Sequence, residues 1–344
     1  MSEHASRRYV IIGAGAVGGT VGGALARSGV DVVLVARGEH ARVLSEKGLT
    51  LRTPDDTCQI PVSAAGAPEE IRLTDRDVLV FATKTHQLDA ALQQWADQPV
   101  HYGDNVIGTA GELLPVLTAL NGVVAEEMAL RFFARVFGVC VWTPAAYVTP
   151  GEVIAKSWPV AAQFHIARWP AALGTDEDRV LLADIAEAWT PAGILVKLPP
   201  DAAPWKYNKL LTNLSNAVVA LTGSARDGEV ATAVIREGEQ VLAQAGIDYV
   251  PFEVSVAARA EGPTVRPVAG TGSVIPNSTW QSLARNSGSV ETDFLNGEIA
   301  RIAHRYGGTA PLNATLARLA RDAARYGRGP GGFTESQLAE QLGL

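Results

Sequence analysis

Cysteine is scarce in this chain, and the scarcity excludes two classes of protein. The sequence has 344 residues and only two cysteines, Cys58 and Cys140, which are far apart. Neither a disulfide framework nor the spacing of a zinc site can be built from them. We therefore expect no metal site and a reducing, cytoplasmic environment.

Basic runs and long apolar runs are also missing. The net charge is −7 and no stretch gathers lysine and arginine, which argues against nucleic acid or an anionic membrane as the main partner. A local cationic pocket for a phosphate is still compatible with this charge. No apolar stretch reaches the roughly 18 residues that a membrane span needs. The opening segment MSEHASRR has no apolar signal core.

The composition that is present fits a well-packed enzyme-sized chain. Hydrophobic residues make up 47% and charged residues 19%, which is enough for a large core, and the length suggests two domains. The histidines are scattered without an i, i+4 pair, and we interpret them as surface or hydrogen-bonded core residues. They stand at positions 4, 40, 86, 101, 165 and 304.

Strand and helix patterns alternate through the first half. Strands are expected at residues 8–13, 31–36, 77–83 and 115–120, with more within 136–168. Helices are expected at residues 16–27 and 86–96 and, after Asn121-Gly122, through about residue 134, whereas 98–112 has little periodicity and is expected to be a loop. Such alternation predicts a doubly wound, mainly parallel sheet.

The segment LPPDAAP at residues 198–204 ends this alternation. Helical patterns follow at residues 204–222, 227–245, 250–260, 278–306 with a break near Gly288, and 312–326. We predict an α/β N-terminal Rossmann-type domain (1–200) followed by an all-α C-terminal domain (201–328). A tail (329–344) should carry a short helix beginning near Thr334, a suitable N-cap.

A glycine-rich turn opens the first helix. Its residues form a GxGxxG pattern: Gly13, Ala14, Gly15, Ala16, Val17 and Gly18. The pattern alone is weak, but here a strand precedes it, a helix follows it and a second strand completes a βαβ unit. Gly13 would allow the tight turn, Gly15 the approach of a pyrophosphate, and Gly18 close packing of helix on strand.

The end of the second strand predicts which dinucleotide binds. NAD-binding proteins place an acid there for the ribose 2′-hydroxyl, but this chain has Ala36 followed by Arg37. A cation in this place suits a 2′-phosphate, so NADPH/NADP+ is the expected cofactor. The alternative is that Arg37 is simply a solvated loop residue.

Polar residues repeat along one face of the first helix of the second half. Leu210, Leu211, Leu214, Val218 and Leu221 form its apolar face. Lys209, Asn213 and Asn216 stand at i, i+4 and i+7, within about 60° of one another. Asparagine has only middling helix propensity, so this stripe is a candidate binding surface, with an incidental wet face as the alternative.

Six separated blocks resemble the ketopantoate reductase (2-dehydropantoate 2-reductase) family, in the family's order and from residue 9 to about 313. They are GAGAVGG (13–19), KTHQ (84–87), LNGVVAEE (120–127), KLLTN (209–213), STWQSLA (278–284) and ETDFLNGEI (291–299). The resemblance implies a Rossmann domain joined to a helical domain. It also implies NADPH-dependent reduction of a small 2-oxo acid, 2-dehydropantoate to pantoate, in pantothenate biosynthesis.

The resemblance also implies roles for particular residues. Lys209 would be the catalytic general acid, with Asn213 as its partner and Glu291 contacting substrate hydroxyls and the lysine. Lys84 and Gln87 would approach the nicotinamide half of the cofactor. The remaining substrate contacts would come from Asn121, which would also approach the cofactor, and from Asn216, Ser278 and Thr279.

Departures from the family pattern fall in the substrate half. Leu120 replaces a glutamine, Trp280 adds bulk, and an aspartate is lost at Ser282. The family's second asparagine is Ala217 here, and Asn216, on the same helical face, is its expected substitute. These changes leave the substrate's identity more open than the reaction type.

Several alternatives remain at this level. Lys206 is the rival of Lys209, and we expect it to be solvated rather than bound to a substrate carboxylate. Glu291 could merely begin a helix, and Asp293 and Asn296 are expected to be structural. The chain could act on another 2-oxo or hydroxy acid, or sense NADP(H) without catalysis. A homodimer is compatible with the sequence, which does not set the oligomeric state.

Overall fold

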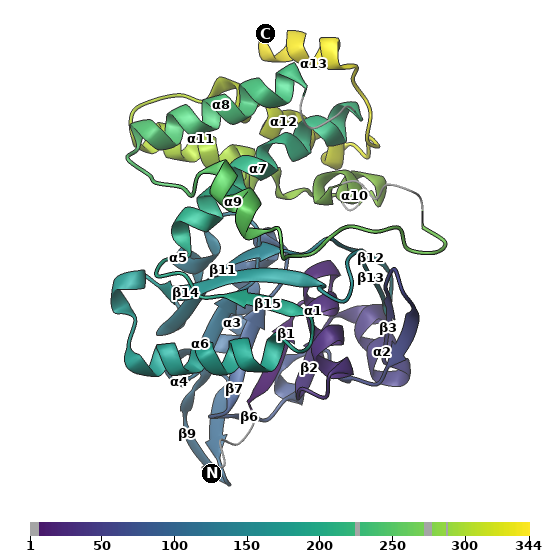
Figure 1. Ribbon diagram of the computed structural model, residues 1–344, viewed down its shortest axis with the longest axis vertical. Coiled ribbons are helices and arrows are strands. Elements are labelled where there is room, and N and C mark those ends of the chain that lie inside the picture. The colour runs from purple at the N-terminus through teal and green to yellow at the C-terminus, as the bar shows by residue number, and fades with distance from the viewer. Residues whose placement is uncertain (1–6, 224–227, 272–276, 287) are drawn as a thin grey trace. The chain divides into compact units, whose positions relative to one another are not determined.

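The computed structural model describes residues 7–223, 228–271, 277–286 and 288–344. Contacts divide the chain into two compact units. Unit 1 comprises Met1–Leu120, Val124–Ala202 and Val256–Thr271, and unit 2 comprises Asn121–Val123, Ala203–Ser255 and Gly272–Leu344. Figure 1 shows the strands and helices of both units.

An eight-stranded sheet forms the centre of unit 1, in the order β15-β14-β11-β10-β7-β1-β2-β5. Its strands are β1 (Arg8–Ile12), β2 (Val32–Val35), β5 (Ser63–Ala65), β7 (Asp77–Phe81), β10 (Pro115–Thr118), β11 (Arg135–Trp142), β14 (Ala162–Trp169) and β15 (Ile194–Lys197). Only the β11–β14 pair is antiparallel among these described strands. The predicted mainly parallel sheet is confirmed.

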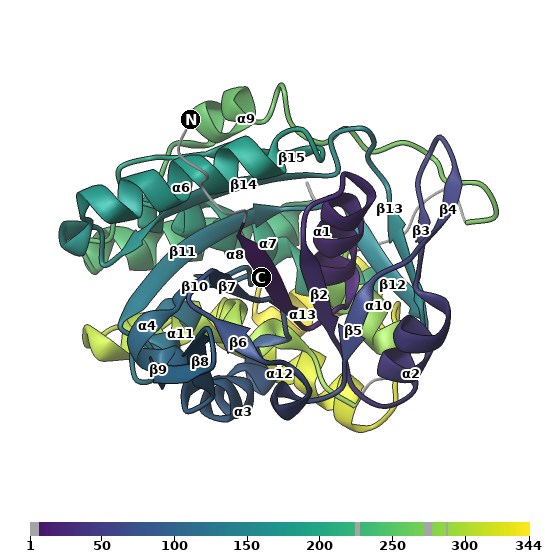
Figure 2. The ribbon, with the colours of Figure 1, turned by 90° about the horizontal axis from the view of Figure 1, so that it is seen from below.

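Both faces of this sheet are covered, which is why its strands are apolar runs rather than alternating ones. Tyr9 and Ile11 of β1 face one core, and Val10 and Ile12 face the other. Helices α1 (Ala16–Arg27) and α6 (Asp176–Trp189) pack on the first face. Helices α3 (Thr85–Ala96), α4 (Ala110–Leu113) and α5 (Ala125–Ala129) pack on the second, as Figure 2 shows for α1, α6, α3 and α4.

Smaller elements complete unit 1. A four-stranded sheet joins β12 (Ala145–Thr149), β13 (Glu152–Ala155), β3 (Leu49–Arg52) and β4 (Thr57–Ile60). Helix α2 (Gly38–Lys47) follows β2, and two 3₁₀ turns, η1 (Pro68–Glu70) and η2 (Ala171–Leu173), lie in connections. The sequence patterns did not predict α2 or α6. Thr175 is the N-cap of α6, and its hydroxyl accepts the Asp178 backbone N–H at 3.2 Å.

The prediction of a loop over residues 98–112 is wrong. A hairpin forms there from β8 (Pro99–Tyr102) and β9 (Asn105–Thr109), followed by α4, and β6 (Leu73–Thr74) pairs with β8. The hairpin turns at Gly103, whose φ of 56° is in the left-handed region that glycine adopts easily. The helix expected to reach about residue 134 is also shorter, since α5 ends at Ala129.

Unit 2 is built from helices, as predicted. They are α7 (Ala203–Thr222), α8 (Glu229–Gln244), α9 (Phe252–Ala258), α10 (Ser278–Ala284), α11 (Asn296–Arg305), α12 (Pro311–Arg325) and α13 (Glu335–Leu342), with a 3₁₀ turn η3 (Glu291–Phe294). The last residues of α9 belong to unit 1. Residue 227, where a helix was expected to begin, lies outside the described residues, as does His4.

The core of unit 2 forms around α7. Leu210, Leu211, Leu214, Val218 and Leu221 are all buried there, which confirms the predicted apolar face. Buried Asn296 donates to the Leu214 carbonyl at 3.1 Å and to Asn313 Oδ1 at 2.9 Å, the structural role expected of it. None of the helices described is long and apolar enough to span a membrane.

Candidate functional site

The glycine-rich turn lies at the carboxyl end of β1, in unit 1. Gly13 and Ala14 both donate backbone N–H bonds to the Val35 carbonyl at 3.0 Å, which ties the turn to the end of β2. Gly15 is the N-cap of α1 and provides no side-chain cap for the helix. The first N–H groups of a helix otherwise need a capping side chain, water or a ligand.

The three glycines have different surroundings. Gly13 has φ +101°, and a Cβ there would lie 2.9 Å from the Ala82 carbonyl group. A Cβ on Gly18 would lie 2.2 Å from the Gly13 oxygen, so α1 packs directly on the turn. In the described part of the chain, apart from the two chain neighbours, nothing lies within 4 Å of a Cβ built on Gly15. The turn and packing predicted for Gly13 and Gly18 are present, and the space at Gly15 fits an approaching ligand.

A second loop runs beside this turn. Strands β1 and β7 are parallel neighbours, with Ile12 opposite Phe81, so the loops after them leave the sheet at the same edge. Lys84 is the N-cap of α3 and is half-buried, and Gln87 lies in the first turn of α3. The N-termini of α1 and α3 therefore lie beside each other, at the carboxyl ends of the strands, where α/β sheets bind nucleotides.

Arg37 is the N-cap of α2, two residues after the end of β2. Its side chain is exposed and bonds to no residue in the described part of the chain. The neighbouring guanidinium, Arg42, is engaged with Glu39 and Glu46 at 2.6 Å each. The hydrogen bond from Arg42 is the main reason that the pKa of Glu39 lies below its usual value. Of these two arginines near the end of β2, Arg42 is paired with carboxylates, whereas Arg37 is not and can contact an anionic ligand.

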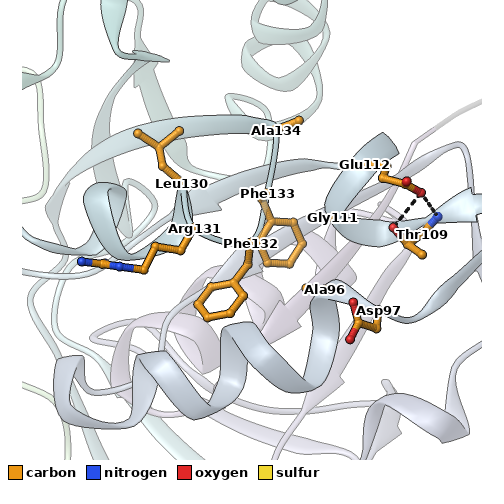
Figure 3. Close-up of a pocket in the computed structure, with 10 residues that line it drawn as sticks. All are labelled: Ala96, Asp97, Thr109, Gly111, Glu112, Leu130, Arg131, Phe132, Phe133 and Ala134. Atoms are coloured by element: carbon orange, nitrogen blue, oxygen red, sulfur yellow. Dashed lines mark hydrogen bonds between the residues drawn. The ribbon is translucent and has the colours of Figure 1, made fainter.

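A surface cavity of about 480 Å³ lies at the other edge of the sheet (Figure 3). The residues lining it precede β10 and β11 or end α3; they include Thr109, Glu112, Phe132 and Phe133. The Glu112 carboxylate is occupied there by the backbone N–H and hydroxyl of Thr109, each at 2.9 Å. The amino ends of parallel strands are not where this fold binds nucleotides, so the cavity is separate from the glycine-rich turn.

In unit 2, the polar stripe of α7 is more buried than a solvent-facing stripe would be. Asn213 and Asn216 are 6% and 4% exposed, and Lys209, one turn before Asn213, is half-buried. Burying amides in this way costs free energy unless they form hydrogen bonds. The interpretation of an incidental wet face does not fit these burials.

Three asparagine side chains form a hydrogen-bonded row. Nδ2 of Asn213 donates to Oδ1 of Asn121 at 3.3 Å, and Nδ2 of Asn216 donates to Oδ1 of Asn213 at 3.3 Å. Within the described residues, Oδ1 of Asn216 receives no hydrogen bond and Nδ2 of Asn121 donates none. The row therefore presents amide donors at its Asn121 end and a buried acceptor at its Asn216 end.

The other predicted residues of unit 2 lie on α10 and η3. Thr279 is buried and Ser278 half-buried on α10, which packs on α7. Glu291 is buried as the first residue of η3, so it does begin a helical turn, although a short one. A Cβ on Gly122 would lie 2.9 Å from the Phe294 carbonyl oxygen, which brings the Asn121–Gly122 turn against the end of η3.

Two features of this region differ from what the sequence patterns predicted. Lys206 is only 2% exposed, so the expectation that it is solvated is wrong. Asn277, which was not singled out, caps α10 by accepting the Trp280 backbone N–H at 3.0 Å and donates to the Asn216 carbonyl at 3.2 Å. Asparagine directly before a helical pattern is the signal that could have identified it.

Comparison with known proteins matches both halves of the chain to one family. The model of the family "Ketopantoate reductase PanE/ApbA" matches residues 9–169, and that of its C-terminal domain matches residues 201–324. The chain is 28% identical to a 2-dehydropantoate 2-reductase of Mesorhizobium japonicum, over 93% of this chain and 99% of the relative. It is 26% identical to that of Pyrococcus horikoshii, over 94% and 99%.

Solved structures share the same fold. A PanE/ApbA family ketopantoate reductase from Ralstonia eutropha superposes with a TM-score of 0.72 at 27% identity, covering 93% of this chain and 99% of that one. A D-mandelate dehydrogenase with NADH and anilino(oxo)acetate has a TM-score of 0.74 at 20% identity, with the same coverage. With both domains matched in order, the chain belongs to the ketopantoate reductase family.

Proposed function

We propose that this protein reduces a 2-oxo acid with NADPH, and that 2-dehydropantoate is its substrate. Relatives that match nearly the full length of the chain are named 2-dehydropantoate 2-reductase. In this proposal unit 1 binds the dinucleotide, and unit 2 supplies the polar side chains that act on the acid. The row formed by Asn121, Asn213 and Asn216 is the observation that carries it.

The cofactor assignment rests on two observations in unit 1. The α1 N-terminus lacks a side-chain cap and has open space at Gly15, which fits a pyrophosphate. Arg37 is exposed after β2, where a 2′-phosphate would be stabilised by its guanidinium. Lys84 and Gln87, at the start of α3, are proposed to approach the nicotinamide half.

The bound nicotinamide would supply the hydride, and the protein must supply a proton and stabilise the oxygen that gains charge. Lys209 is proposed as the proton donor, since a lysine ammonium is protonated at neutral pH. The amides of Asn121 and Asn213 would donate to the substrate's oxo and carboxylate oxygens. Glu291, Thr279 and Ser278 are proposed to complete the polar surroundings of the substrate.

The acceptor end of the row favours a substrate that carries a hydroxyl group. Oδ1 of Asn216 is buried and receives no hydrogen bond within the described residues. A buried acceptor is costly until a donor reaches it, and the hydroxyl of 2-dehydropantoate is such a donor. A 2-oxo acid of the same carbon skeleton without that hydroxyl would leave the acceptor unpaired and should be a poorer substrate.

The test is NADPH oxidation with 2-dehydropantoate beside a panel of 2-oxo acids, including 3,3-dimethyl-2-oxobutanoate, which has the same carbon skeleton and no hydroxyl. We expect kcat/KM to be highest for 2-dehydropantoate and at least about tenfold lower without the hydroxyl. The Asn216→Ala variant should lose that preference. Binding of NADPH without turnover of any 2-oxo acid would instead indicate a sensor.

A different 2-oxo acid is the second candidate, and the bulk of Trp280 favours it. Trp280 lies on α10 two residues after Ser278 and packs partly buried against the core of unit 2. A larger side chain near the substrate residues would reshape the pocket available to the acid. A better rate on another member of the panel, lost in Lys209→Met as well, would support this candidate.

A further inference from the structure

His40 connects three separate parts of unit 1. It lies in the first turn of α2, three residues after Arg37, and is half-buried. Its Nε2 is 2.7 Å from the carbonyl oxygen of Ala14, in the glycine-rich turn. Its Nδ1 is 2.8 Å from the backbone N–H of Gly151, in the turn between β12 and β13. The ring also packs edge-on against Tyr147, with centroids 4.9 Å apart.

These contacts determine the protonation state of the ring. The Gly151 N–H is a donor, so Nδ1 must accept, and in a neutral imidazole the proton is then on Nε2. Nε2–H therefore donates to the Ala14 carbonyl. Burial lowers the pKa of His40 from its ordinary value, more than the hydrogen bond to Ala14 raises it. The neutral form that makes both bonds is thus the form present at neutral pH.

The bond to Ala14 acts on the peptide that the dinucleotide would meet. The Ala14–Gly15 peptide is planar and trans, so fixing the Ala14 carbonyl also fixes the direction of the Gly15 N–H on the opposite side. Glycine by itself restricts its backbone least of all residues. Among the described residues nothing lies within 4 Å of a Cβ built on Gly15, so packing at that position adds no restraint on this peptide.

We infer that His40 is a positioning residue for the dinucleotide, which presents the Gly15 N–H to the pyrophosphate by holding the Ala14 carbonyl. The inference rests on the proposed function, since it requires a dinucleotide at the glycine-rich turn. His40 also lies three residues after Arg37, the N-cap of α2. Its bond to Ala14 therefore connects the residue proposed to bind the 2′-phosphate with the turn proposed to bind the pyrophosphate.

Two substitutions separate the two bonds. In His40→Gln the amide nitrogen reaches about the place of Nε2 and can still donate to Ala14. In His40→Asn the amide oxygen reaches about the place of Nδ1 and can still accept from Gly151, but the bond to Ala14 is lost. We expect the Kd for NADPH, measured by fluorescence without substrate, to rise about three- to tenfold in His40→Asn and to stay near wild type in His40→Gln.

Thermal unfolding of the unliganded variants distinguishes positioning from a structural role. If His40 only supports the fold, the Asn and Gln variants will differ in unfolding temperature while their Kd values for NADPH stay equal, and this result would overturn the inference. Equal Kd values at equal stability would overturn it too. Failure of the wild-type protein to bind any dinucleotide would instead refute the proposed function, so the two failures can be told apart.

The pH dependence of binding gives an independent readout. Protonation would put a hydrogen on Nδ1, and its repulsion from the facing Gly151 N–H would displace the ring. The bond from Nε2–H to the Ala14 carbonyl is then lost with the bond to Gly151 as the pH falls, whereas the glutamine of His40→Gln does not titrate. Tyr147 of β12 is the titratable group that faces the ring. Ala14 and Gly151 contact the ring through backbone groups. On α2 itself, the charges of Glu39 and Arg42 pair with each other. As the pH falls below 6.5, the Kd for NADPH should rise more steeply for wild type than for His40→Gln. The variant is the control, because the titration of NADPH itself affects both proteins equally. Identical profiles would contradict the inference.

Discussion

Asn213 of α7 donates a hydrogen bond to Asn121, which lies 92 residues earlier in the chain, at 3.3 Å. The bond brings the turn that follows the strand β10 in sequence to the helix that carries Lys209. The same Asn213 amide accepts a hydrogen bond from Nδ2 of Asn216 at its Oδ1, so the three amides have a defined donor and acceptor order. These three asparagines are therefore one connected group rather than separate surface residues.

Removing the middle amide should impair catalysis more than folding. We expect Asn213→Ala to raise KM and lower kcat, with kcat/KM falling about tenfold to a hundredfold, because it removes a substrate donor and disconnects its two neighbours. Steady-state kinetics with 2-dehydropantoate measures this.

Asn208, on the same helix, is the matched control. It is fully buried and donates to the Val250 carbonyl at 2.8 Å. Asn208→Ala should lower the free energy of unfolding by about 1–3 kcal/mol and leave KM unchanged at temperatures where the variant is folded. An equal change of KM in both variants would contradict a binding role for the row.

Arg37→Ala should change cofactor preference. We expect the Kd for NADPH to rise about tenfold while that for NADH changes little, because only NADPH has the 2′-phosphate. Arg179→Ala is the control of equal charge change, on α6, beside β14 and β15 at the far side of the sheet from β2. Equal weakening for both dinucleotides would refute the assignment of Arg37.

Gly15 and Gly18 should respond differently to alanine. Gly15→Ala places its methyl group in open space, so its unfolding midpoint should stay near wild type while the Kd for the dinucleotide rises at least about tenfold. In Gly18→Ala the new Cβ meets the Gly13 oxygen and the Ile11 side chain, which should destabilise unit 1 by about 1–3 kcal/mol or more. Wild-type affinity in Gly15→Ala would mean that the ligand does not approach there.

Unit 1 should lose stability on acidification because of His165. This histidine of β14 is 2% exposed, and burial, aided by the charge of Lys197, lowers its pKa to about 4. Between pH 6.5 and about 4 the unfolded chain binds a proton at His165 that the folded chain does not. The free energy of unfolding should therefore fall by up to about 1.4 kcal/mol per pH unit in this window.

Urea unfolding at pH 7 and pH 5 measures this effect. His165→Leu should show a smaller loss of stability between the two pH values than wild type, whatever its absolute stability at pH 7. A loss of the same size would show that His165 carries no part of the acid sensitivity.

The buried runs and the glycine-rich turn made most of unit 1 predictable. Strands β1 and β7 and helices α1 and α3 begin and end within two residues of their predicted positions, because both faces of a parallel sheet demand apolar residues. The β8–β9 hairpin was missed because its residues are largely exposed, so no apolar alternation marks it. Its only local signal was the turn at Gly103.

Sequence periodicity did not predict which side chains from distant parts of the chain contact each other. Helical angles predicted that Lys209, Asn213 and Asn216 share one face. They did not predict the direction of the hydrogen bonds between the amides. They also gave no indication that Lys206 is buried, since burial depends on what covers a face. The contact of His40 with Ala14 requires α2, which the sequence patterns did not predict.

The most direct test of the account is the single-turnover rate of NADPH oxidation in Lys209→Met, with 2-dehydropantoate in excess and the Kd for NADPH measured beside it. Lys206→Met, one helical turn earlier, is the comparison variant. We expect a rate about 10²–10⁴-fold lower in Lys209→Met with cofactor affinity unchanged, and a much smaller effect on the rate in Lys206→Met. A Lys209→Met variant that retains most of the rate, or a loss confined to Lys206→Met, would contradict the assignment of Lys209 as proton donor.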